Sequence, residues 1–118
     1  MKVLESINDE EVLEELFSEH GVVLAYLFGS QAEGKAGPLS DVDIAVLLGP
    51  EIERETWADV QVDLMNALMD LLDRSDLDLV ILNRATPVMA QRVAQHGRVL
   101  FEATPGTRAR FQIAALST

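Results

Sequence analysis

Two short apolar runs, Val22–Phe28 and Val42–Leu48, constrain the fold of this chain more than any other feature of its sequence. The first run is unbroken, and the second is interrupted only by Asp43. Runs of this length are typical of strands buried on both faces, whereas a half-solvated strand alternates apolar and polar residues. A glycine follows each run, which indicates a turn. We therefore expect two strands that are covered on both faces.

Helix and strand patterns alternate along the rest of the chain. Apolar residues recur at intervals of three and four over residues 12–17 and 52–73, and a further helix is expected over 88–95, after a Thr-Pro pair. Apolar segments at 77–82 and 99–101 predict two more strands. This order predicts an α/β (α+β) fold, in which helices pack on a sheet. Residues 103–118 show no clear pattern, and we expect a loop and an irregular helix there.

Size, charge and cysteine content exclude several classes of protein. A chain of 118 residues fits a single domain, 1–118, and the absence of cysteine excludes disulfides and thiolate metal sites. The net charge of −11 argues against direct binding of nucleic acid, which requires clustered lysine and arginine. We find neither a signal peptide nor an apolar run of membrane-spanning length, so we expect a cytoplasmic protein with no membrane contact.

The pair Gly29-Ser30 directly follows the first predicted strand. A glycine at this position lets the backbone turn sharply and approach a ligand closely. Backbone amides after the strand, together with the Ser30 hydroxyl, then offer hydrogen-bond donors to a phosphate group. The alternative interpretation is an ordinary turn without a ligand.

Asp41 and Asp43 are spaced as i and i+2 at the start of the second predicted strand. This spacing places both carboxylates on the same face of a strand, where they repel each other unless a cation lies between them. Oxygen ligands of this kind suit Mg²⁺ or Mn²⁺. In a chain with 20 acidic residues, an Asp-x-Asp pair can also arise by chance.

Asp78 lies within the apolar segment of the third predicted strand. A lone carboxylate in such a segment is costly to bury unless it is paired, protonated or bound to a metal. If this strand lies beside the second one, Asp78 completes a set of three carboxylates that can hold two metal ions. Asp76 is an alternative third ligand, although it lies nearer the turn.

The combination of these motifs resembles the signature of the polymerase-β-like nucleotidyltransferase superfamily, and within it the minimal nucleotidyltransferase (MNT) group. The similarity rests on the segments 27–34, 40–47, 77–80 and 97–101, and it covers about residues 22–102, which we take as the core. The resemblance implies a mixed sheet of about four strands with helices packed on it. Many members of this group are antitoxins that accompany a HEPN-domain ribonuclease toxin.

The resemblance also implies a reaction and a role for each motif. AMP would pass from ATP to a tyrosine of the HEPN toxin, with which the chain would form a hetero-oligomer. Gly29 and Ser30 would hold the β- and γ-phosphates of ATP, and Asp41 and Asp43 would ligate both Mg²⁺ ions. Asp78 would ligate one Mg²⁺ ion and help to deprotonate the attacking hydroxyl.

Two other functions remain open from the sequence. The acidic chain could neutralise a partner by masking a basic surface without any reaction. It could also transfer AMP to a small hydroxyl compound, although relatives of that kind carry an additional helical domain.

Overall fold

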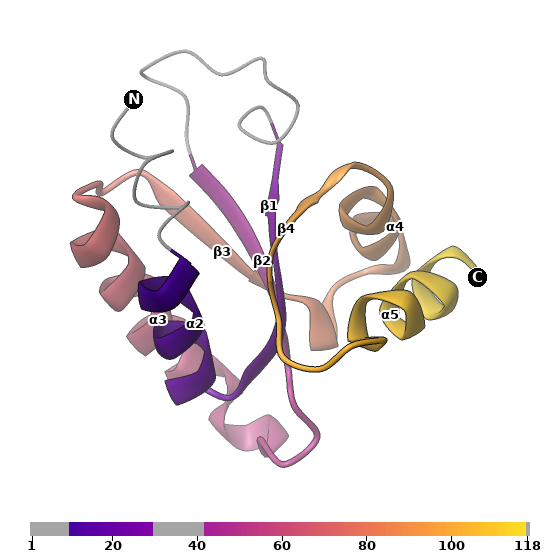
Figure 1. Ribbon diagram of the computed structural model, residues 1–118, viewed down its shortest axis with the longest axis horizontal. Coiled ribbons are helices and arrows are strands. Elements are labelled where there is room, and N and C mark those ends of the chain that lie inside the picture. The colour runs from indigo at the N-terminus through magenta and orange to yellow at the C-terminus, as the bar shows by residue number, and fades with distance from the viewer. Residues whose placement is uncertain (1–9, 30–41, 118) are drawn as a thin grey trace.

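The computed structural model describes residues 10–29 and 42–117. Within these ranges the chain forms a four-stranded mixed sheet that is covered by helices on both faces (Figure 1). The strands are β1 (Val22–Phe28), β2 (Val42–Leu48), β3 (Leu77–Ile81) and β4 (Arg98–Glu102). The α-helices are α2 (Glu10–Glu19), α3 (Trp57–Leu72), α4 (Pro87–His96) and α5 (Thr107–Leu116), and the 3₁₀ helices are η1 (Arg54–Thr56) and η2 (Leu82–Arg84).

The strand order is β3-β2-β1-β4, so β1 and β2 are the inner strands and β3 and β4 are the edges. Strand β1 runs antiparallel to β2 and β4, whereas β2 and β3 are parallel. The parallel pair is connected through α3, as a crossover requires. The two inner strands coincide with the two apolar runs, which confirms the expectation that these runs are covered on both faces.

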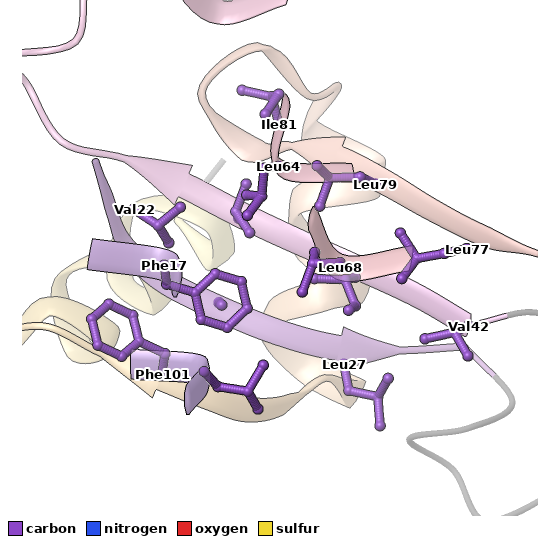
Figure 2. Close-up of a cluster of buried hydrophobic side chains, with 14 of the residues drawn as sticks. Phe17, Val22, Leu27, Val42, Leu64, Leu68, Leu77, Leu79, Ile81 and Phe101 are labelled. Carbon is purple, nitrogen blue, oxygen red and sulfur yellow. The ribbon is translucent and has the colours of Figure 1, made fainter. Parts of the chain in front are cut away.

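The sheet separates two hydrophobic cores. Helices α2 and α3 cover one face, and α4 and α5 cover the other (Figure 1). The larger core lies under α2 and α3, where Phe17 stacks on Phe101 with ring centroids 5.7 Å apart (Figure 2). The smaller core, under α4 and α5, contains Tyr26, Ala45 and Val93. Strand residues therefore alternate between two different environments.

Local hydrogen bonds determine where α4 and α3 begin. Helix α4 begins as predicted, because the Thr86 hydroxyl oxygen accepts a hydrogen bond from the Met89 N–H at 3.2 Å and Pro87 occupies the first turn. Helix α3 begins later than residue 52. The Trp57 indole N–H donates to the Ile52 carbonyl at 3.2 Å, so the preceding residues form a turn and η1.

The segment without a clear sequence pattern contains a ten-residue helix, α5. Its Phe111 ring lies 5.9 Å from the ring of Tyr26 in β1, and Ala115 is buried. Helix α5 therefore belongs to the packed structure rather than to a loose tail. None of the described helices has the length and apolar character needed to cross a membrane.

Candidate active site

Asp43 and Asp78 lie next to each other on neighbouring strands. They are paired residues of the parallel β2–β3 ladder, and adjacent strands of a sheet lie about 4.8 Å apart. Val42 and Ile44, on either side of Asp43, point into the larger core, as does Leu77 beside Asp78. Because successive side chains point to opposite faces, both carboxylates lie on the face that α4 and α5 partly cover.

Gly29 approaches the Asp43 carboxylate closely. It follows β1, in which Phe28 is paired with Asp43 across the β1–β2 ladder. The φ angle of Gly29 is +76°, in the left-handed region that favours glycine. A Cβ atom built on this residue would lie 2.6 Å from Oδ2 of Asp43. Residue 29 must therefore lack a side chain for the Asp43 carboxylate to keep its position.

Two of the predicted ligands, Ser30 and Asp41, lie outside the described residues. In the sequence, Ser30 directly follows Gly29 and Asp41 directly precedes Val42, the first residue of β2. Their predicted roles at the phosphates and the metal remain predictions.

The expectation that Asp78 is buried was wrong. Asp78 is exposed, whereas Asp43 is half-buried. The reason is the position of β3 at the edge of the sheet, which sequence patterns do not reveal. On an edge strand, a polar residue of the correct parity reaches solvent even when its neighbours are buried. No desolvation cost therefore requires a metal at Asp78, and the support for a metal site is the pairing of Asp78 with Asp43.

Asp76, the alternative third ligand, is held by a different group. Its carboxylate accepts two hydrogen bonds from the Arg74 guanidinium, one of them from Nε to Oδ1 at 2.6 Å. This hydrogen bonding holds the pKa of Asp76 below its usual range. The structure thus favours Asp78 over Asp76 as the third ligand. Arg74 could not be identified from the sequence, since no pattern marks two charged residues of a turn as a structural pair.

The donor set fits a hard divalent cation. Asp43 and Asp78 supply carboxylate oxygens from two adjacent strands, and such oxygens suit Mg²⁺ and Mn²⁺. The described part of the chain has no group of three or more His, Cys, Asp or Glu residues that could hold a metal ion. A complete site of three carboxylates therefore depends on Asp41.

A separate groove of about 650 Å³ lies where β1 begins and β2 ends, which is the end of the sheet away from Asp43. It is lined by Val23 and Leu48 of the sheet and by Phe111 of α5, among others, and includes neither carboxylate. The candidate active site is therefore an open arrangement at one end of the sheet, distinct from this groove.

The sequence identifies the family of this chain. Residues 11–105 match the polymerase beta nucleotidyltransferase family, and the chain belongs to that family. A curated relative is the protein adenylyltransferase MntA of Shewanella oneidensis, which is 36% identical over 96 residues, or 80% of this chain. The match covers 62% of MntA, so the chain spans less than two thirds of the length of this relative.

Solved structures extend the comparison. The structure of a toxin–antitoxin with AMP-PNP matches with a TM-score of 0.75 and 31% identity, over 92% of this chain and 85% of that chain. The structure of the tri-AMPylated Shewanella oneidensis HEPN toxin in complex with MNT antitoxin matches with a TM-score of 0.69 and 28% identity, over 99% and 85% of the two chains. These matches confirm the predicted fold and the resemblance to minimal nucleotidyltransferases.

Proposed function

We propose that this chain is a Mg²⁺-dependent protein adenylyltransferase that acts in the cytoplasm as an antitoxin. It transfers AMP from ATP to a tyrosine hydroxyl of a HEPN ribonuclease toxin, with which it forms a hetero-oligomer. The observation that carries the proposal is the pairing of Asp43 with Asp78 beside Gly29. The relatives support it, since one is named a protein adenylyltransferase and another structure contains an AMPylated HEPN toxin.

Asp41, Asp43 and Asp78 are the residues that would hold two Mg²⁺ ions. When bound, Mg²⁺ neutralises charge on the phosphates and lowers the pKa of the attacking hydroxyl. The AMP-PNP in a related toxin–antitoxin structure supports ATP as the substrate.

The residues of the chain bind and orient the reactants. The backbone amides after Gly29 and the Ser30 hydroxyl donate hydrogen bonds to the β- and γ-phosphates. The acceptor oxygen forms a bond to the α-phosphorus as the bond to pyrophosphate breaks, and Asp78 receives the hydroxyl proton. The products are an AMP-tyrosine ester and pyrophosphate.

The exposure of Asp78 supports a protein as the acceptor. A hydroxyl presented by another protein can reach an open carboxylate at the edge of a sheet, and the partner's own surface then excludes water from the reaction. A small hydroxyl compound requires a pocket that surrounds it.

The test is the intact mass of a candidate HEPN partner after incubation with this protein and MgATP. We expect a gain of one or more AMP units that EDTA prevents. Asp43→Asn should abolish the gain. Asp63→Asn removes the same charge from an exposed position on α3 and should leave the gain unchanged.

Other outcomes separate the competing functions. A stable complex on gel filtration without a mass change would contradict AMP transfer and favour neutralisation by masking. If neither a complex nor a mass change forms, the HEPN partner is wrong, and release of pyrophosphate with small hydroxyl compounds becomes the next assay.

A further inference from the structure

The alignment of Asp43 with Asp78 depends on the register of a short edge strand. Strand β3 has only five residues, and among the described strands it is hydrogen-bonded to β2 alone. A slip of one residue would move Asp78 to the opposite face of the sheet, because side chains alternate along a strand. A device that fixes the start of β3 against the start of β2 therefore also fixes the two carboxylates.

Contacts of this kind lie in the turn just before β3. Arg74 and Asp76 form a two-pronged ion pair in the turn between α3 and β3, and the Arg74 side chain is only 12% exposed. The backbone carbonyl of Asp76 accepts the Val42 N–H at 3.2 Å. Val42 directly precedes Asp43, and Asp76 lies two residues before Asp78. The ion pair thus holds Asp76, whose carbonyl group is hydrogen-bonded to the first residue of β2 just before β3 begins.

The end of α3 anchors the same turn. The N–H of Arg74 donates to the Met69 carbonyl at 3.1 Å, and Asp73 adopts a left-handed conformation with φ of +54°. The backbone of Arg74 is therefore tied to the helix, while its side chain is tied to Asp76. This arrangement couples the end of α3 to the start of β3.

The other end of the β2–β3 ladder has an independent attachment. The Asn83 side chain accepts the Leu48 N–H at 2.8 Å and donates to the Leu48 carbonyl at 2.9 Å. Residues 48 and 83 are separated by the same 35 positions as the ladder partners Val42 and Leu77. The Asn83 amide thus continues the ladder at the end remote from the carboxylates, and it provides a matched control.

We propose that Arg74 is a positioning residue of the nucleotidyltransferase site, which holds Asp78 in register with Asp43 through the Arg74–Asp76 pair and the Asp76–Val42 hydrogen bond. The inference rests on the proposed function only in assigning these two carboxylates to a divalent cation. The role that we assign to this pair is geometric, because its two hydrogen bonds fix the orientation of the Asp76 side chain. The planar guanidinium matters because it engages both carboxylate oxygens, which a lysine ammonium does not reproduce.

The test compares Arg74→Gln with Asn83→Ala by hydrogen exchange of individual amides and by Mn²⁺ titration. Arg74→Gln should speed exchange of the Val42 amide by about tenfold or more, the scale expected for loss of a charge-assisted hydrogen bond. It should leave the Leu48 amide unchanged and weaken Mn²⁺ binding by about tenfold, the lower end for residues that orient metal ligands. Asn83→Ala should speed exchange at Leu48 and leave Val42 exchange and Mn²⁺ affinity unchanged.

Arg74→Lys separates geometry from charge. This variant keeps the positive charge and should still show faster Val42 exchange and weaker Mn²⁺ binding than the wild type. Unchanged Val42 exchange and Mn²⁺ affinity in Arg74→Gln would overturn the proposal, as would full recovery of both in Arg74→Lys. Neither measurement needs an acceptor, so failure of AMP transfer would leave the result interpretable. If the wild type binds no Mn²⁺, the proposed function fails, and Val42 exchange alone still decides whether Arg74 holds the strand.

Discussion

The two faces of the sheet serve different purposes, although the same strands build both. The face under α2 and α3 is apolar along its length and is closed by aromatic and leucine side chains. The face under α4 and α5 is apolar in the middle, but it carries Asp43 and Asp78 at one end and a buried tyrosine hydroxyl. Alternation of side chains along one strand can therefore assign stability to one face of a sheet and chemistry to the other.

The largest effect should follow from removing a carboxylate on the face under α4 and α5, which we call the second face; the face under α2 and α3 is the first face. Asp78→Asn should reduce AMP transfer by roughly a thousandfold, which corresponds to about 4 kcal/mol of transition-state stabilisation. Its free energy of unfolding should change by no more than about 1 kcal/mol, because Asp78 is exposed on an edge strand. Single-turnover rates and urea unfolding of the same preparation check both parts. A large loss of stability would show that the two faces are not separable.

The converse experiment removes a side chain from the first face. Leu68 is fully buried in the larger core, and Leu68→Ala should lower the free energy of unfolding by about 3 kcal/mol. The rate of AMP transfer, measured well below the melting temperature, should stay within about twofold of the wild type, since Leu68 lies on the face of the sheet opposite to both carboxylates. Urea unfolding and the transfer assay test this pair of expectations. A rate that falls with stability would contradict the division between the faces.

A third comparison uses two glycines at the two ends of β1. Gly21 and Gly29 both have φ of +76°, and a Cβ on either would crowd the tip of a side chain, Ile52 or Asp43 respectively. Alanine at either position should cost about 1–2 kcal/mol of stability through the left-handed backbone. Only Gly29→Ala should also weaken Mn²⁺ binding, because only there does the crowded side chain carry a ligand. Equal Mn²⁺ affinity in both variants would remove Gly29 from the site.

The sequence was sufficient to predict those parts of the structure that depend on residues close together in the chain. The bounds of β1 and β2 follow from two apolar runs, and the start of α4 follows from a Thr-Pro cap. These features depend on a few neighbouring residues. The proximity of Asp78 to Asp43 was expected only on the condition that the third strand lies beside the second, and the β2–β3 ladder meets that condition.

Features that depend on distant contacts were not predicted. Helix α5 was expected only as an irregular helix, because the exposed Ile113 and Leu116 blur the period of its apolar residues. Its contact with the sheet, where Phe111 meets Tyr26, was not predicted. The exposure of Asp78 depends on which strand forms the edge. The roles of Arg74 and Asn83 depend on backbone groups of β2, which lie more than thirty positions away in the chain.

The smallest effect concerns Tyr26, whose hydroxyl lies within the second face. The side chain is fully buried, and no described residue forms a hydrogen bond with the hydroxyl. Tyr26→Phe removes a polar group that has lost its water contacts, so it should raise the free energy of unfolding by about 1 kcal/mol at pH 8. Urea unfolding measures this change. A loss of similar size would mean that the hydroxyl has a partner in the folded protein.

Tyr26 should also make the stability of the protein depend on pH in the alkaline range. Burial raises the pKa of Tyr26 above its ordinary value of 10.0, and the positive charge of Arg108 offsets this only in part. The unfolded chain therefore releases the phenolic proton first, and stability should fall as the pH rises from about 10 through the pKa of the folded protein. Tyr26 is the only tyrosine, so absorbance at the phenolate band reports its titration without overlap from another tyrosine. In Tyr26→Phe this part of the alkaline loss should disappear, whereas a phenolate that forms near pH 10 in the folded protein would show that the second face admits water at its centre.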